Sequence, residues 1–208
     1  MVLGMRRNTC AGAASVRLAG VFPNERPTQT AHREVAAVLC PGDLAIDATA
    51  GNGHDTVFLA ERVGDSGKVL AFDVQAEAIL AARARVDAAG QTARVDFIHG
   101  SHAALSEHAA PGSAAAVMFN LGYFPGGDHA VITRTGETLA ALNAALVVLK
   151  PGGILTVVCY PGHPGGEEES AAVTGWSEGL DAARFSASVV RRTDTLRPSP
   201  FLVAVRRK

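Results

Sequence analysis

One short segment of the sequence combines carboxylates, glycines and hydroxyl or amide side chains at close spacing. It runs Asp47-Ala48-Thr49-Ala50-Gly51-Asn52-Gly53-His54-Asp55-Thr56, and a further carboxylate, Asp73, follows twenty residues after Gly53. Glycine has no Cβ atom, so the backbone at Gly51 and Gly53 can adopt positive φ and come close to a ligand. We expect this loop to bind a small polar ligand. The expected contacts are Asp47, Thr49, Gly51, Asn52, Gly53, Asp55, Thr56 and Asp73.

The carboxylate Asp47 indicates which ligand the loop would hold. A dinucleotide-binding loop would have a third glycine near position 56, where this chain has Thr56, and a pyrophosphate would be repelled by Asp47. The amino group of the methionine part of S-adenosyl-L-methionine carries a positive charge that Asp47 would attract. Asp73 stands where an acidic residue can accept hydrogen bonds from both ribose hydroxyls of an adenosine. The spacing therefore predicts S-adenosyl-L-methionine as the cofactor.

Polar and aromatic residues later in the chain are candidates for binding a methyl acceptor. Asn120 could orient an amine through its side-chain carbonyl, Tyr123 could stack on a uracil ring, and His163 could accept the amine proton. His32 and His102 could line the same cleft. Each residue also has a purely structural alternative: a turn cap for Asn120, loop packing for Tyr123, a turn for His163, and surface or core positions for the other two histidines.

Several classes of protein are disfavoured by what the sequence lacks. It has no His-x-x-x-His or His–Cys pairing at ligand spacing and no Cys-x-x-Cys, so we expect no metal site. It has no Gly-x-Ser-x-Gly motif, which disfavours a hydrolase. No run approaches the roughly 18 apolar residues of a membrane span, and polar residues and Arg17 interrupt the first twenty residues, which makes them a poor signal peptide. We expect a cytoplasmic enzyme with no membrane partner.

Strands and helices alternate along most of the chain. The hydrophobic pattern predicts strands at 44–48, 68–72, 94–98, 114–119 and 154–160, and helices at 30–39, 54–63, 76–89, 131–149 and 167–180. Two further strands, 185–190 and 201–205, follow each other directly. This order predicts an α/β fold with a doubly wound, mostly parallel seven-stranded sheet and an antiparallel edge strand. The candidate residues would then gather at the carboxyl edge, where such sheets bind ligands.

Length and charge set the expected domain organisation and partner. The chain has 208 residues, 48% hydrophobic and 19% charged, which suits one domain over 21–208 after a poorly ordered extension over 1–20. The net charge is −1, but five arginines oppose two glutamates before Pro41, and seven basic residues oppose Asp194 from Arg184 onward. If the two ends fold side by side, they could form a basic patch for a polyanion. Otherwise they are two solvated termini.

Three separated motifs resemble a known family. They are the segment from Asp47 to Thr56, then Phe119-Asn120-Leu121-Gly122-Tyr123 with Pro125-Gly126-Gly127-Asp128, and later Tyr160-Pro161-Gly162-His163-Pro164-Gly165-Gly166 followed by Glu168-Glu169. From about Thr30 to the C-terminus the chain resembles the small bacterial rRNA methylase family related to YtqB, also called MnmM. The resemblance implies a class I, Rossmann-like, S-adenosylmethionine-dependent methyltransferase. It further implies N-methylation of the 5-aminomethyl group of the wobble uridine in tRNA, from nm5U to mnm5U.

The resemblance also implies roles for individual residues. Asn120, Tyr123 and His163 would form the catalytic group, and His32, Tyr123, Tyr160 and His163 would bind the substrate. Ser101, His102 and Asn120 would add to the cofactor contacts. The Asn-Leu-Gly-Tyr segment is similar to the Asn-Pro-Pro-Tyr loop of amino-directed methyltransferases but lacks its prolines. The implied partner is the anticodon region of tRNA, and a homodimer is compatible with the resemblance.

Alternatives of other classes remain open at this point. The same cofactor could serve a ribosomal RNA or a small-molecule amine, because a fold and a cofactor site do not determine the acceptor. A nucleotide-dependent oxidoreductase and a non-catalytic RNA-binding module are two further alternatives. Binding of S-adenosylmethionine, of NAD or of neither would separate them.

Overall fold

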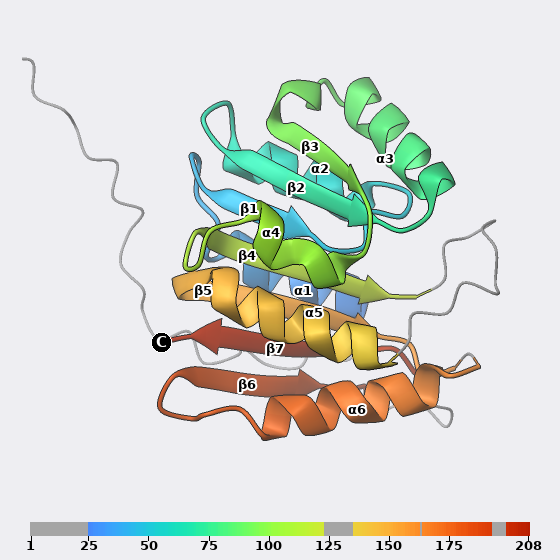
Figure 1. Cartoon of the computed structure of the whole chain (residues 1–208), viewed down its shortest axis with the longest axis vertical. Coiled ribbons are helices and arrows are strands. Elements are labelled where there is room, and N and C mark those ends of the chain that lie inside the picture. Colours follow the sequence, from blue (N-terminus) through green and yellow to red (C-terminus); the bar gives the residue numbers. More distant parts are fainter. Residues whose placement is uncertain (1–24, 123–134, 163, 193–198) are drawn as a thin grey trace, which may run out of the picture.

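A seven-stranded sheet forms the centre of the computed structural model, which describes residues 25–122, 135–162, 164–192 and 199–208 (Figure 1). Its strands are β1 (Leu44–Asp47), β2 (Lys68–Asp73), β3 (Val95–His99), β4 (Ala114–Leu121), β5 (Leu149–Cys159), β6 (Phe185–Val190) and β7 (Phe201–Arg207), in the spatial order β3-β2-β1-β4-β5-β7-β6. The first five strands pair in parallel, and β7 runs antiparallel to β5 and β6. The predicted fold class, mostly parallel with its antiparallel part at one edge, is confirmed.

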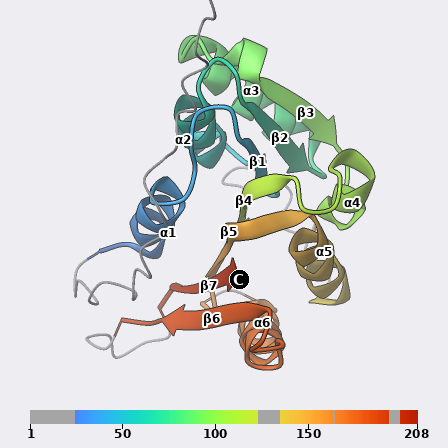
Figure 2. The same ribbon diagram turned by 90° about the vertical axis from the view of Figure 1, so that its left-hand side faces the viewer.

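Helices cover both faces of the sheet (Figure 2). One face carries α1 (Pro27–Ala36), α2 (His54–Val63) and α3 (Ala76–Ala88), and the other carries α4 (Leu105–His108), α5 (Thr135–Val148) and α6 (Gly166–Glu178). Short 3-10 turns occupy Thr92–Arg94 and His102–Ala104. The sequence pattern did not predict α4 or these turns, because a segment of three or four residues is too short to show helical periodicity. Helix α1 begins three residues earlier than predicted, with Pro27 in its first turn.

The order of the strands reverses at β1 and β4. Strand β1 pairs with β2 on one side and β4 on the other, so the chain leaves β1 and β4 on opposite faces. Figure 1 shows the arrowheads of β1, β2, β4 and β5 at the same edge. In doubly wound sheets, ligands bind at this reversal of strand order. The residues that follow β1 and β4 are therefore the candidates for a ligand-binding site.

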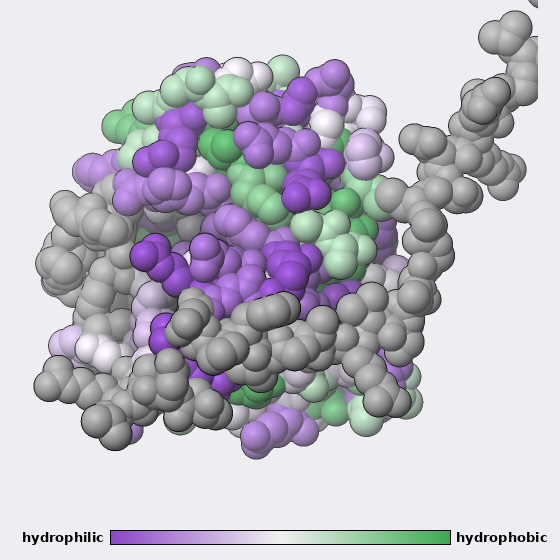
Figure 3. Space-filling model, turned by 180° about the vertical axis from the view of Figure 1, so that it is seen from behind, coloured by the Kyte–Doolittle hydropathy of each residue, from purple (hydrophilic) through white to green (hydrophobic). Residues whose placement is uncertain are grey.

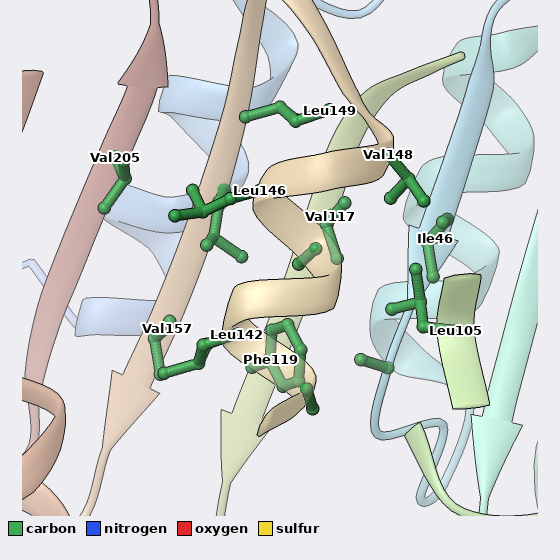
Figure 4. Packing of buried hydrophobic residues seen from close by; sticks show 14 of the residues in the cluster. Ile46, Leu105, Val117, Phe119, Leu142, Leu146, Val148, Leu149, Val157 and Val205 are labelled. Atoms are coloured by element: carbon green, nitrogen blue, oxygen red, sulfur yellow. The ribbon is translucent and has the colours of Figure 1, made fainter. Parts of the chain in front are cut away.

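Two apolar layers hold the helices on the sheet. In the layer beneath α5, Leu142 and Leu146 point toward Val117 and Phe119 of β4 and Val157 of β5 (Figure 4). Leu142 and Val117 have no exposed surface, and Phe119 is 1% exposed. Burying a large apolar side chain contributes roughly 1.5 to 3 kcal/mol, so this layer keeps β4 and β5 rigid beneath the site.

An ion pair with a buried carboxylate attaches α1 to the last strand. Glu34 is 4% exposed and accepts a hydrogen bond from Arg206 Nη2 of β7 at 2.8 Å. Arg33 lies beside Glu34 and also pairs with Glu25. The N-terminal helix and the C-terminal strand therefore lie side by side, but Arg33 and Arg206 at this contact face carboxylates of the chain itself.

The surface over α1 and α2 is mostly polar. Viewed from behind, hydrophilic side chains gather across the middle of this face (Figure 3). No helix in the described ranges is long and apolar enough to cross a membrane. The predicted extension over 1–20 lies outside the described residues, and the division into an extension and one domain stays a prediction.

A close approach between α3 and the end of the β1 loop generates a testable prediction. Gly53 has φ +77°, and a Cβ atom there would lie 2.7 Å from Ala82 Cα and 3.0 Å from Ala82 O of α3. Gly90 has a similar φ of +69°, but a Cβ atom there would meet nothing within 4 Å. We expect Gly90→Ala to lower the free energy of unfolding by about 1 to 2 kcal/mol, the cost of left-handed backbone. Gly53→Ala should cost about 1 to 3 kcal/mol more, because backbone must move.

Urea denaturation of both variants measures this difference, and Gly90→Ala serves as the matched control. Equal losses of unfolding free energy in the two variants would contradict the close packing of α3 on the loop.

Candidate functional site

The loop after β1 is organised by a fully buried carboxylate. Asp47 is 0% exposed; its Oδ1 accepts a hydrogen bond from Thr49 N at 3.1 Å and its Oδ2 accepts one from Thr56 Oγ1 at 2.5 Å. Thr49 begins the loop and Thr56 lies in the first turn of α2, so Asp47 joins the two ends. A buried carboxylate needs such partners, and here they set the shape of the loop.

The glycines give the loop its bend and leave space beside it. Gly51 has φ +49°, and the nearest atom to a Cβ built there is Thr49 O at 3.7 Å. The carbonyl oxygen of Asn52 accepts a hydrogen bond from Arg85 Nε at 2.5 Å, which attaches the loop to α3. The backbone at Gly51 is therefore open to a ligand, while the Asn52–Gly53 side of the loop is held against the helix.

Asp73, at the end of β2, connects this loop to the neighbouring strand. Its Oδ2 accepts a hydrogen bond from Gly51 N at 2.9 Å and its Oδ1 accepts one from Gln75 N at 3.0 Å. A carboxylate offers about four acceptor positions, so two backbone donors do not exhaust it. Asp73 can still accept hydrogen bonds from a ligand such as a ribose.

Negative charge is concentrated around the loop. The pKa of Asp47 is raised to about 7, mainly by burial and also by the charges of Asp55 and Asp73, while the hydrogen bonds from Thr56 and Thr49 oppose the rise. Such a shift means that the charged form of Asp47 lacks a compensating cation. The carboxylates around the loop therefore suit a ligand that carries a positive charge.

The segment after β3 supports the loop from the other face. His102 is 7% exposed, its Nδ1 lies 3.1 Å from Ala48 O, and its ring meets Phe119 edge-on with centroids 5.5 Å apart. Burial lowers the pKa of His102, which favours the neutral ring. Because the Ala48 carbonyl can only accept a hydrogen bond, Nδ1 carries the donated proton. Ser101 Oγ accepts a hydrogen bond from Ala103 N at 3.2 Å and caps the short turn. In the described contacts, His102 supports the β1 loop and Ser101 holds the turn that carries His102.

The end of β4 lies directly against the β1 loop. Asn120 N donates a hydrogen bond to Thr49 Oγ1 at 2.8 Å. Burial and the charge of Asp55 raise the pKa of Tyr160, and a side-chain hydrogen bond with Asn120 opposes the rise. A Cβ atom on Gly122 would lie 3.3 Å from the Tyr160 ring, so the backbone passes close to that ring. The structure thus brings Thr49, Asp55, Asn120 and Tyr160 together.

His32, which comes from α1, completes this group. Its Nε2 lies 2.6 Å from Asp55 Oδ1, and its ring stacks on Phe58 with centroids 3.9 Å apart and planes 1° from parallel. Phe58 was missed in the sequence. Its spacing of three residues from Asp55 on one helix is the signal that could have found it.

Two of the predicted acceptor-site residues have no described position. Tyr123 and His163 lie outside the described residues, so their roles stay predictions. Within the described ranges, no group of three or more His, Cys, Asp or Glu side chains could hold a metal ion.

The sequence of the chain matches a known protein family and individual methyltransferases. The model of the family described as "Putative rRNA methylase" matches residues 69–206. The "tRNA (mnm(5)s(2)U34)-methyltransferase, chloroplastic" of Arabidopsis thaliana is 38% identical over 179 residues, which make up 81% of this chain and 65% of that protein. An arsenite methyltransferase from Aquipseudomonas alcaligenes is 34% identical over 125 residues, or 58% of this chain and 34% of that protein. The chain therefore spans less than two thirds of the length of either relative.

Solved structures agree with these matches. A "putative rRNA-methylase" from Clostridium thermocellum superposes with a TM-score of 0.85 at 35% identity, covering 88% of this chain and 98% of that one. A "putative methyltransferase" from Streptococcus mutans, solved in complex with SAH, superposes with a TM-score of 0.80 at 33% identity, covering 88% of this chain and 99% of that one. By its family match, its sequence identity and its fold, the chain belongs to the rRNA methylase family.

Proposed function

We propose that this chain is an S-adenosyl-L-methionine-dependent methyltransferase that N-methylates the 5-aminomethyl group of the wobble uridine in tRNA, converting nm5U to mnm5U. The observation that carries the proposal is the contact between a negatively charged glycine loop and a polar acceptor group. Thr49 of the loop bonds Asn120, and Asp55 of the same segment bonds His32. Membership of the family and the printed activity of the Arabidopsis relative support the choice of reaction and of tRNA.

The described residues fit the cofactor. Asp73 would accept hydrogen bonds from the ribose, and the open backbone at Gly51 would lie against the ligand. Asp47 has no exposed surface, so it would act on the ligand through its charge and through the loop that it holds. When bound, the cofactor supplies an electrophilic methyl group on a positively charged sulfur.

The acceptor group suits an amine. Methyl transfer is an in-line displacement, so a neutral and well-aligned nucleophile provides much of the rate. The side-chain amide of Asn120 and the hydroxyl of Tyr160, which bond each other, are the described groups that would orient an amine. Tyr123 and His163 remain candidates for stacking on the base and for accepting a proton.

The proposal also covers the partner, the oligomeric state and the location of the enzyme. We propose that it binds the anticodon region of tRNA, forms a homodimer and is cytoplasmic. A ribosomal RNA acceptor is the second candidate, because the family description names rRNA.

Methyl transfer to a defined tRNA tests the substrate. With labelled S-adenosylmethionine, the full chain should label tRNA that carries 5-aminomethyluridine at the wobble position, and nuclease digestion with mass spectrometry should show one added methyl group on that nucleoside. Transfer should weaken as salt rises, because a tRNA substrate binds through its phosphates.

Two controls make this result specific. The same tRNA without the aminomethyl group should stay unlabelled, and isolated ribosomal RNA should take up no label. Labelling of ribosomal RNA alone would move the proposal to the second acceptor, and absence of label in both RNAs would reject an RNA acceptor.

The raised pKa of Asp47 predicts how cofactor affinity depends on pH. An opposite charge favours the ionised carboxylate, so binding of the cationic cofactor should lower the Asp47 pKa from about 7 and release a proton when the pH is below that value. Affinity should therefore rise with pH by at most about tenfold per unit and level off above about pH 7. In Asp47→Asn this rise should be absent, since an amide does not titrate.

Calorimetry in buffers of different ionisation enthalpy measures both the affinity and the released proton. Asp96→Asn is the control, because Asp96 is an exposed carboxylate that pairs with Lys68 at the start of β3. An unchanged pH dependence in Asp47→Asn would assign the titration to another group.

A further inference from the structure

We propose that His32 and Asp55 form the proton-accepting pair of the acceptor site, with His32 Nδ1 taking the proton and Asp55 holding the ring. The inference rests on the proposed N-methylation, because an amine must be neutral before it can attack a methyl group. It assigns a role to a contact that neither the family description nor the related structures name.

The short contact determines which ring nitrogen carries the proton. His32 Nε2 lies 2.6 Å from Asp55 Oδ1, and the two side chains are 31% and 12% exposed. An ionised carboxylate only accepts hydrogen bonds, so Nε2 of the neutral ring must be the N–H donor. The lone pair is then on Nδ1, which has no hydrogen-bond partner among the described residues.

Two residues of α2 fix the orientation of the His32 ring. Phe58 stacks on the imidazole with planes 1° apart, and Arg62 lies over the Phe58 ring at 5.6 Å from its centroid. Asp55 and Phe58 are three residues apart on α2, so one helix provides both the hydrogen bond and the stacking surface. Rotation of the His32 ring would break the contact with Asp55. This is the arrangement in which a carboxylate orients a histidine that acts as a general base.

The pair lies between the cofactor loop and the acceptor residues. Asp55 follows the glycine loop in the first turn of α2, and its charge adds to the effect of burial in raising the pKa of both Asp47 and Tyr160. His102, the buried alternative, has its Nδ1 against Ala48 O, and burial lowers its pKa. Of His32 and His102, His32 is therefore the better placed to exchange a proton with solvent.

The charged neighbours of His32 on α1 have partners of their own. On α1 itself, Arg33 pairs with Glu25, and Glu34 pairs with Arg206 of β7. On α2, Asp55 contacts the imidazole directly and Arg62 lies over the Phe58 ring that stacks on it. Tyr160, which follows β5, is within the electrostatic reach of Asp55. Asp55 is thus the charged group in direct contact with the imidazole.

The proposed step balances in protons and electrons. The substrate arrives as a primary ammonium, and the lone pair on His32 Nδ1 takes one of its protons while Asp55 stabilises the resulting imidazolium. The freed nitrogen lone pair forms the N–C bond to the methyl carbon as the C–S bond breaks and its electron pair stays on sulfur. The product leaves as a secondary ammonium, and the partly exposed His32 returns its proton to water.

Replacement of the base tests the step through a pH profile. At saturating cofactor, His32→Gln should lower the rate of methyl transfer at pH 7 by about 100-fold, the scale of general-base catalysis. The rate should recover as the pH rises above the pKa of the substrate amine, because the amine then deprotonates without help. Cofactor affinity, measured by calorimetry, should stay within twofold. His108→Gln, which removes an exposed imidazole on α4, should leave the rate and profile unchanged.

A measurement without substrate tests the geometry. Nitrogen NMR of the protein should show His32 with its proton on Nε2 at pH values where the ring is neutral, and Asp55→Asn should remove this preference. Asp55→Asn should also lower the transfer rate at saturating cofactor, by about tenfold or more.

The outcomes separate the two proposals. A rate and pH profile unchanged in His32→Gln, or a proton found on Nδ1 of neutral His32, would overturn the pair. Because the NMR spectrum needs no substrate, a wild-type protein that leaves aminomethyluridine tRNA unmethylated would overturn the proposed function, whatever the tautomer.

Discussion

The buried carboxylate of Asp47 determines the arrangement of the site. Its two oxygens bond Thr49 N and Thr56 Oγ1, so the chain must turn within the residues between them and begin α2 at one place. That start puts Asp55 in the first turn of α2, at the carboxyl edge. Asp55 then reaches His32. A carboxylate without exposed surface can be kept in the core only with partners, and these partners are the structural elements of the site.

Distant parts of the chain are needed to complete this arrangement. The hydroxyl of Thr49 accepts the hydrogen bond from Asn120 N, which ties the β1 loop to the end of β4 across the reversal of strand order. Helix α1 brings His32 to the edge, and the pairing of Glu34 with Arg206 of β7 helps to hold this helix on the sheet. A substitution of Arg206 would therefore disturb the position of α1 as well as remove a charge, since it would leave Glu34 buried without its partner.

Local patterns in the sequence predicted the elements better than the contacts. The helix over 54–63 and the strand over 185–190 were predicted to the residue, because their apolar positions repeat at helical or strand spacing. The glycine loop and its carboxylates were also found, since they follow a strand directly. The bond between His32 and Asp55 joins residues 23 apart, and that between Glu34 and Arg206 joins residues 172 apart. No periodic pattern encodes such tertiary pairs.

The distribution of charge links folding to binding. Burial raises the pKa of Asp47, and the charges of Asp55 and Asp73 add to the rise instead of compensating it, so ionised Asp47 is unfavourable in the folded protein without a ligand. A cation placed beside the loop would relieve this repulsion. The ionised loop thus reduces the stability of the folded chain, and a cationic ligand that binds the folded state alone would recover it. A buried carboxylate with a perturbed pKa, such as Asp47, is typical of functional sites for this reason.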